Sequence, residues 1–189
     1  MEHKGTVQLE TDRLILRRFR KEDARAAYEN WTSDDRVTKF LTWPTHSSVE
    51  VSEYVVSDWA GRYEDERFYQ WAIVPKGNGD RPIGSISAVK VIDPVDTVHI
   101  GYCIGYDWWH QGIMPEALHA LIRFFFEEVK ANRIEAVHDV NNPNSGRVMA
   151  KCGMQYEGTH REAGRNNQGI CDECFYAILQ KDWEQGQRS

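Results

Sequence analysis

The sequence predicts an α+β fold, organised as one domain around a mixed sheet. Short β-branched and aromatic segments occupy both halves of the chain, and a strand–helix–strand unit lies between them. The 189 residues contain no repeat and no linker. Because a strand–helix–strand crossover joins parallel neighbours, the sheet must combine parallel and antiparallel pairs. We expect a single domain over residues 1–189, with its core at about 9–183.

Two helices lie between the first strands of the predicted fold. Asp23 is expected to cap the first helix, and Ser47 or Ser48 to cap the second. The segment 75–80 is a turn cluster that predicts an antiparallel hairpin. The expected elements, in chain order, are a strand at 14–19, a helix through 24–31, a helix at 49–63, and strands at 69–74 and 83–92.

The second half supplies the crossover and the last strands. Pro115 is expected at the first position of a long helix, where its missing N–H costs nothing, and Gly153 closes a short helix. The expected elements are a strand at 98–105, a helix at 115–130, a strand at 133–140, a helix at 145–152, and strands at 154–160 and 174–179.

Charge and composition exclude several classes of protein. Lys and Arg total 23 against 29 Asp and Glu, a net charge of −6, whereas a general nucleic-acid binder shows a basic excess. No apolar run approaches the ~20 residues of a membrane span, and no secretory signal is expected because residues 1–5 contain no apolar stretch typical of one. Cys171 and Cys174 form a single pair without further ligands, so no metal is expected. With four scattered cysteines, the chain is expected to be cytoplasmic with reduced thiols.

The loop between the strand at 98–105 and the long helix carries the chemical signal. Amides at the start of a helix point outward at the positive end of its dipole, and they bind phosphate or pyrophosphate without a basic side chain. Gly112 allows a ligand to approach the backbone closely. The alternative is an ordinary strand–loop–helix junction in which the glycine only makes the turn. There is no P-loop and no Gly-x-Gly-x-x-Gly motif, which disfavours nucleotide hydrolysis.

The same loop resembles motif A of the GNAT N-acetyltransferases, and the chain as a whole is similar to the RimJ/RimL-like subgroup. The loop Trp109-His110-Gln111-Gly112-Ile113-Met114 matches the pattern Gln/Arg-x-x-Gly-x-Gly/Ala at its central glycine. The subgroup's other blocks, in order, are Leu9 to Arg17, Ile100-Gly101-Tyr102, Trp108-Trp109, Glu116-Ala117, Asn142 to Met154 with Ser145, Val148, Lys151 and Gly153, then Glu157-Gly158, and finally Gly169, Asp172, Tyr176 and Asp182-Trp183. The resemblance covers about Leu9 to Trp183.

The resemblance implies the GNAT fold, a mixed and mostly antiparallel sheet whose central parallel strands splay apart and are flanked by helices. It implies acetyl-CoA in that gap as cosubstrate, no metal, and a homodimer. Backbone groups of Cys103, Ile104 and Gly105 would pair with the pantetheine arm. The pyrophosphate would lie on the loop Trp109, His110, Gln111, Gly112, Ile113 and Met114, and Asn142 would contact the cofactor arm. Met114, where the family has Gly or Ala, must point away from the phosphates.

Two residues are candidates for acid–base chemistry. His99 stands where the subgroup carries a glutamate base, and imidazole, which titrates near pH ~6.5, can accept a proton at neutral pH. Its alternative is a half-buried strand histidine that a neighbour satisfies. Met149 replaces the tyrosine acid of many GNATs, so Ser145 is the candidate for protonating the thiolate, with a helix N-cap as the alternative role.

The expected function is transfer of an acetyl group to a primary amine, directly within a ternary complex. An N-terminal α-amine, with a pKa of ~7.7–8.0, suits a weak base better than lysine at ~10.4. The first alternative acceptor is a small amine such as a polyamine, an amino acid or an antibiotic. The second alternative is an acyl-CoA-binding module without turnover. Tyr54 and Trp59 are candidate acceptor contacts, with packing under the sheet as the alternative.

Overall fold

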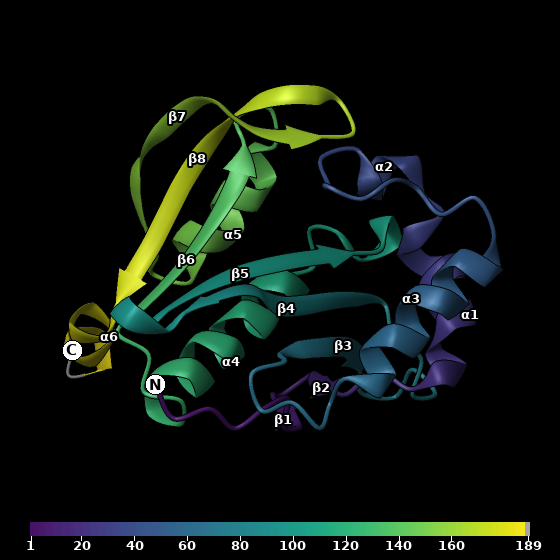
Figure 1. Ribbon diagram of the computed structural model, residues 1–189, viewed down its shortest axis with the longest axis horizontal. Coiled ribbons are helices and arrows are strands. Elements are labelled where there is room, and N and C mark those ends of the chain that lie inside the picture. Colours follow the sequence, from purple (N-terminus) through teal and green to yellow (C-terminus); the bar gives the residue numbers. More distant parts are fainter. Residues whose placement is uncertain (188–189) are drawn as a thin grey trace.

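A computed structural model describes residues 1–187 as an eight-stranded sheet in the order β1-β2-β3-β4-β5-β6-β8-β7 (Figure 1). The strands are β1 (Leu9–Glu10), β2 (Leu14–Arg17), β3 (Gln70–Pro75), β4 (Gly84–Ile92), β5 (Thr97–Ile104), β6 (Arg133–Asp139), β7 (Gln155–Asn166) and β8 (Gly169–Leu179). The α-helices are α1 (Ala24–Ala27), α2 (Asp35–Thr38), α3 (Val49–Gly61), α4 (Ile113–Glu127), α5 (Pro143–Lys151) and α6 (Gln180–Gln187). The short turns are η1 (Lys21–Asp23), η2 (Tyr28–Thr32), η3 (Asp93–Val95) and η4 (Tyr106–Trp108).

One parallel pair interrupts an otherwise antiparallel sheet, as the crossover predicts. β5 and β6 are in parallel register over Thr97–His99 and Arg133–Glu135, after which they separate. Figure 1 shows the two strands starting side by side and diverging, with β7, β8 and α5 on the β6 side. Every other pairing is antiparallel. The predicted fold class, with its central splayed pair, is confirmed.

Two apolar clusters cover the two faces of the sheet. On β3, Trp71 and Ile73 belong to the cluster built around α4, while Ala72 and Val74 belong to the cluster of α1 and α3. Since successive strand residues point to opposite faces, α4 lies on one face and α1 and α3 lie on the other. The same alternation places Ile100 and Ile104 of β5 against α4, and Cys103 toward α1 and α3.

The expected strands and long helices are present, but several ends differ. α4 begins at Ile113 after Gly112, whose φ is +73°, so Pro115 is its third residue rather than its first. Pro115 still costs nothing there, because the first N–H groups of a helix have no intrahelical partner. The helix expected through 24–31 is split into α1 and the π-helical turn η2, and α2 was not expected. β7 and β8 extend into one long hairpin.

The capping predictions are corrected in two places. The Asp23 side chain does not cap α1; it accepts from the Arg20 amide within η1 and pairs with Arg17. Ser48 lies at the N-cap of α3 with an extended backbone, but its side chain caps no amide. Among residues 1–187, no helix combines the length and apolar character needed to cross a bilayer.

Candidate active site

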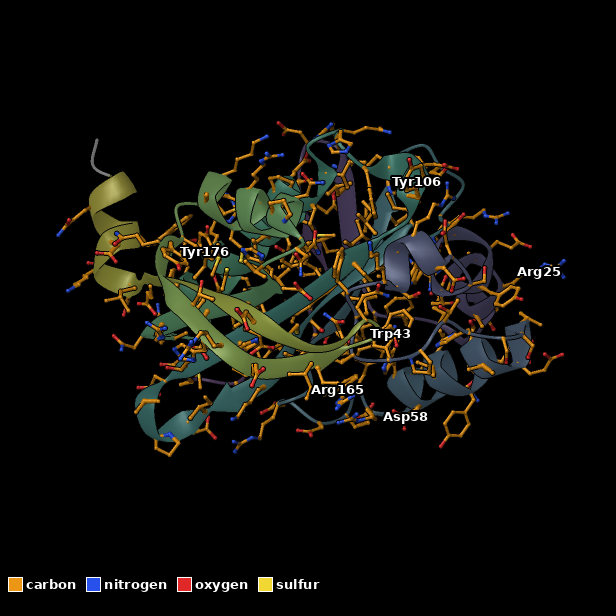
Figure 2. All side chains as sticks on the ribbon, turned by 90° about the horizontal axis from the view of Figure 1, so that it is seen from above. Arg25, Trp43, Asp58, Tyr106, Arg165 and Tyr176 are labelled. Atoms are coloured by element: carbon orange, nitrogen blue, oxygen red, sulfur yellow. The ribbon has the colours of Figure 1, made fainter. Side chains whose placement is uncertain are left out.

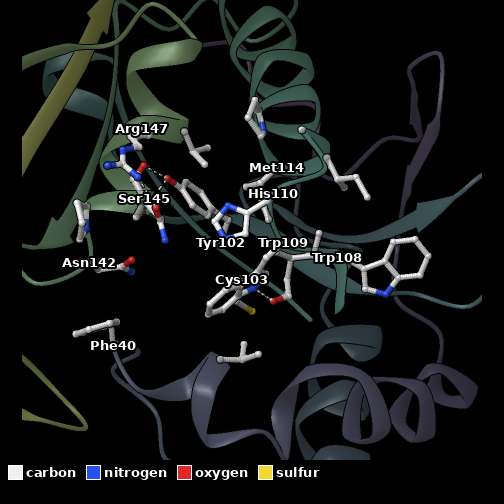
Figure 3. A pocket seen from close by; sticks show the side chains of 18 of the residues that line it. Phe40, Tyr102, Cys103, Trp108, Trp109, His110, Met114, Asn142, Ser145 and Arg147 are labelled. Atoms are coloured by element: carbon white, nitrogen blue, oxygen red, sulfur yellow. Dashed lines mark hydrogen bonds between the residues drawn. The ribbon is translucent and has the colours of Figure 1, made fainter. Parts of the chain in front are cut away.

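A cavity of about 510 Å³ opens where β5 and β6 separate (Figure 3). The end of β5, the loop into α4, the start of α5 and the region of α2 form its walls. Of the residues that the sequence predicted for the coenzyme, those on the cavity wall are Cys103, Ile104, Trp109, His110, Gly112, Ile113, Met114, Asn142 and Ser145. The strand separation therefore brings the predicted loop, strand and short helix together around one space.

The loop before α4 presents free amides. Within residues 1–187, the N–H groups of Gln111, Gly112, Ile113 and Met114 donate to no protein acceptor. His110 and Gly112 both adopt left-handed backbone angles, with φ of +61° and +73°, and this turns the loop into the helix. Unpaired amides at a helix N-terminus form an anion site. Met114 is only 6% exposed and packs against the core cluster, and it also lines the cavity.

A clamp from the first hairpin holds this loop in place. Glu116, in the first turn of α4, accepts from the Thr11 hydroxyl at 2.5 Å and from Nε of Arg13 at 2.6 Å. The Arg13 guanidinium also donates to the carbonyl oxygen of Gln111 at 3.0 Å. Burial alone would raise the pKa of Glu116, but the hydrogen bonds from Thr11 and Arg13 outweigh it and hold that pKa below its ordinary value. The clamp fixes the loop from outside and leaves its amides unoccupied.

The charges on the cavity wall favour an anionic ligand. Arg36, Arg147 and Lys151 lie on the wall, and no Asp or Glu is among the lining residues that the structure describes. Arg36 is held by a short pair with Asp34 and stacks over the ring of Tyr106 at 3.8 Å. A cationic wall in a chain with a net charge of −6 is a local feature rather than a consequence of composition.

Ser145 meets a tyrosine that the sequence analysis did not assign to the site. The Tyr102 hydroxyl lies 3.0 Å from Ser145 Oγ and 3.0 Å from the Ser145 carbonyl oxygen (Figure 3). This contact runs from β5 to α5 across the gap between the strands. Burial raises the pKa of Tyr102, so its phenol is protonated and available as a donor. The Ile100-Gly101-Tyr102 block was the only signal that could have indicated it.

The alternative role of Ser145 as an N-cap is not met. α5 begins at Pro143, its N-cap is Asn142, and Ser145 is the third helical residue. The hydroxyl instead faces the cavity beside Tyr102. Cys103 also lines the cavity, but burial raises the pKa of its thiol, which sits 3.5 Å from the Ser85 hydroxyl. A protonated, buried thiol does not favour an acyl-cysteine route.

Several predicted site residues lie elsewhere. Gly105 is not on the cavity wall: its N–H donates to the Ile83 carbonyl, and the Asn30 carbonyl closes over the position a Cβ would take. Tyr54 is 79% exposed on the outer side of α3, whereas Trp59 packs against Phe19 at 4.9 Å. The structure brings neither aromatic residue to the cavity.

Gln111 and His99 are not among the residues that line the cavity. The Gln111 side-chain amide donates to the Asp107 carbonyl, so only the backbone N–H of Gln111 is left to bind a ligand. His99 lies at the closed end of the strand pair, where its Nδ1 is 3.3 Å from Glu135 Oε1. Its alternative role, a strand histidine paired with a neighbour, thus has a partner in Glu135.

The β7–β8 turn closes over the cavity region from the α2 side. The Asn167 side-chain amide donates to the carbonyl oxygens of Thr38 and Trp43, both at 2.8 Å. The backbone N–H of Asn167 donates to the carbonyl oxygen of Leu41. Figure 2 shows Trp43 beside this hairpin. Among residues 1–187, no three His, Cys, Asp or Glu side chains gather as a metal site.

A mixed sheet whose parallel strands separate around a cavity bordered by free amides is also the architecture of known acetyltransferases. The structure superposes on the GNAT-family acetyltransferase of Bacillus anthracis with a TM-score of 0.80 and 27% identity, covering 93% of this chain and 99% of that one. Residues 13–155 match the Acetyltransferase (GNAT) domain, and the chain belongs to this family of N-acetyltransferases.

Two curated relatives match over nearly their whole length. An uncharacterized N-acetyltransferase of Bacillus subtilis, YoaA, is 30% identical over 171 residues, which covers 90% of this chain and 96% of YoaA. The [ribosomal protein uS5]-alanine N-acetyltransferase of Escherichia coli is 26% identical over 188 residues, covering 95% and 94%. Ribosomal-protein acetyltransferases are therefore among the relatives, at modest identity.

Proposed function

We propose that this enzyme transfers the acetyl group of acetyl-CoA to a protein N-terminal α-amine, directly within a ternary complex. The observation that carries the proposal is the run of unpaired backbone amides at 111–114, of which residues 112–114 lie on the wall of the cavity between the separating strands. Such amides bind a pyrophosphate without side-chain charge, and Arg36, Arg147 and Lys151 add the positive wall that a polyanionic coenzyme requires.

Different cavity residues would bind different parts of the coenzyme. The amides of 111–114 would take the pyrophosphate, while Cys103, Ile104 and Asn142 border the gap where the pantetheine arm would lie. Trp109 supports this wall because its indole N–H donates to the Ile104 carbonyl at 2.9 Å. When bound, acetyl-CoA supplies the activated acetyl thioester.

Two side chains would move protons in the reaction. Ser145, with its hydroxyl on the cavity wall, would donate toward the leaving sulfur, and Tyr102 would hold that hydroxyl in place. His99 would accept the proton that the acceptor amine loses, through water, because it does not lie on the wall itself. Replacing His99 with Ala should then reduce turnover; full activity of His99→Ala across pH would remove it from the mechanism.

The acceptor is inferred from two lines of support. An α-amine gives up its proton about 3–4 kcal/mol more easily than a lysine side chain, which suits an imidazole base. The E. coli relative is an alanine N-acetyltransferase of ribosomal protein uS5. Such an acceptor also agrees with the expected cytoplasmic location.

Coenzyme release discriminates this acceptor from the alternatives. Free thiol is followed with acetyl-CoA and a peptide that begins with alanine, with a polyamine, and with no acceptor. Release above background with the peptide supports the proposal. Release only with the polyamine favours a small-amine enzyme, and a CoA-induced rise in Tm without any release favours a binding module.

A further inference from the structure

His99 and Glu135 form a hydrogen-bonded pair at the closed end of the β5–β6 gap. They lie opposite one another in the parallel register, and His99 Nδ1 is 3.3 Å from Glu135 Oε1. The two side chains are only 19% and 17% exposed. The other carboxylate oxygen of Glu135 accepts from Nε of Arg133 at 2.9 Å. Both oxygens of Glu135 are therefore engaged in fixed directions.

We propose that Glu135 is a positioning residue that fixes the tautomer of His99, so that Nε2 carries the lone pair that serves as the base. The inference rests on the proposed function, in which His99 takes a proton from the acceptor amine. An ionised carboxylate only accepts hydrogen bonds, so the imidazole nitrogen that faces it must carry the hydrogen. A neutral imidazole has one N–H, which leaves Nε2 unprotonated.

The opposite ring nitrogen is available for this task. Within residues 1–187, His99 Nε2 has no hydrogen-bonding partner. His99 also shares its face of β5 with Cys103, which lines the cavity four residues further on. The base therefore lies along the strand from the cavity wall, and one or more waters must carry the proton between them.

The charged neighbours of the pair lie on β4, β6 and β7. Lys90 of β4 lies opposite His99 in the antiparallel register, and Arg133 of β6 lies behind Glu135. Glu157 of β7 holds the two terminal nitrogens of Arg133 at 2.8 and 2.5 Å. Glu135 is thus the carboxylate that contacts the ring, while Glu157 belongs to the same cluster without touching it.

The proton step balances without any further reactant. The N–H bond of the acceptor ammonium breaks, its electron pair stays on nitrogen, and Nε2 gains the proton through water. The imidazolium that results is balanced by the Glu135 carboxylate, and it returns the proton to solvent after the product leaves. Without the carboxylate, the imidazolium would be less stable and the ring would be free to adopt either tautomer.

The tautomer can be measured without any assay of activity. In ¹⁵N-histidine-labelled protein near pH 8, two-bond ¹H–¹⁵N correlations separate a protonated Nδ1 from a protonated Nε2, and the His99 signals are assigned by their loss in His99→Ala. The expected result is a protonated Nδ1 in the wild type and a mixed or reversed pattern in Glu135→Gln. A protonated Nε2 in the wild type would overturn the proposal.

Kinetics test the consequence with a matched control. Glu135→Gln should lower kcat by about 10-fold to 100-fold, with the KM for acetyl-CoA unchanged. Glu157→Gln removes an equal charge from the same Arg133 cluster, and it should keep the wild-type kcat and KM. Equal kcat values for the two variants would overturn the positioning role.

The two failures remain distinguishable. If the protein released no coenzyme with any amine, the proposed function would fail while the tautomer measurement still reported on the pair. If the wild type were active and Glu135→Gln were indistinguishable from it in both measurements, only the inference about Glu135 would fail. The CoA-induced rise in Tm shows for each variant that the cavity is intact.

Discussion

The two ends of the β5–β6 pair differ in how their polar groups are satisfied. At the closed end, the strands are in register over three residue pairs, and His99, Glu135, Arg133 and Glu157 form one connected cluster. At the open end, the strands have separated, and the amides of 111–114 have no partner within residues 1–187.

The difference separates the groups that stabilise the fold from those reserved for a ligand. A hydrogen bond made inside the protein contributes about 0.5–1.5 kcal/mol to folding, whereas a group left for a ligand contributes nothing until the ligand binds. Substitutions at the open end should therefore change turnover or affinity more than stability. Substitutions in the supports around it should change both.

The largest effect is expected from Ser145→Ala, at the open end. Loss of the hydroxyl that faces the cavity should reduce kcat by about 100-fold, the lower range for a positioned proton donor. The free energy of unfolding should fall by only about 1 kcal/mol. Steady-state kinetics and urea denaturation measure the two quantities.

Ser33→Ala is the matched control for this prediction. The Ser33 hydroxyl likewise makes one hydrogen bond, which it donates to the Tyr28 carbonyl at 2.6 Å, but Ser33 does not line the cavity. It should lose similar stability with unchanged kcat. If Ser145→Ala behaved like Ser33→Ala, Ser145 would have only a structural role.

The next effect concerns the contact that spans the gap. Tyr102→Phe removes the hydroxyl that is hydrogen-bonded to both Ser145 Oγ and the Ser145 carbonyl oxygen, while Ser145 itself remains. We expect kcat to fall by about 10-fold, less than for Ser145→Ala, because the hydroxyl stays present but is no longer oriented. The free energy of unfolding should fall by about 1–2 kcal/mol. A larger loss of kcat than in Ser145→Ala would show that the tyrosine itself acts in the reaction.

The sequence was sufficient for the features that local rules determine. The order of strands and helices along the chain, the crossover and the turn at Gly112 follow from hydrophobic patterns and turn chemistry. The free amides were predictable because a helix that starts directly after a loop leaves its first N–H groups without partners. No long-range contact was needed for either prediction.

The remaining site residues depended on tertiary pairing. The amide of Gly105 is taken by Ile83 in the neighbouring hairpin, and Tyr102 reaches Ser145 from a strand 43 residues away. Tyr54 was misplaced because α3 turns Ser52 and Val56 toward the core, where Ser52 bonds His46 and Thr32. A buried polar network, rather than the aromatic residues, therefore determines which face of this helix packs against the core.

A smaller effect is expected in the clamp that supports the loop. Glu116→Gln weakens the bonds from Thr11 and Arg13, so the KM for acetyl-CoA should rise by about 3-fold to 5-fold, and stability near pH 7 should fall by about 1–2 kcal/mol. Glu10→Gln, in the same hairpin but exposed, is the control and should change neither quantity measurably.

The pH dependence of this variant has a definite sign. The pKa of Glu116 is lower in the folded protein than its ordinary value of 4.5, so the ionised clamp stabilises the fold fully above that value. The advantage of the wild type over Glu116→Gln should shrink as the pH falls below 4.5 and vanish below the folded-state pKa. Denaturation midpoints between pH 3 and pH 7 measure it, and a pH-independent difference would contradict the assignment.

The smallest effect is expected from His110→Gly. His110 holds a left-handed backbone at φ +61°, a strain of about 1–2 kcal/mol for a residue with a Cβ, which glycine removes. Glycine also loses about 0.5–1 kcal/mol more entropy on folding, so the net change in stability should stay within about 0.5–1 kcal/mol. Affinity for acetyl-CoA should change less than 2-fold, because the amides of 111–114 remain. Gly112→Ala tests the opposite change: its Cβ would meet only Arg13 at 3.5 Å, so backbone strain alone should destabilise it by about 1 kcal/mol. A tenfold loss of affinity in His110→Gly would show that the imidazole, and not only the backbone, contributes to the open end.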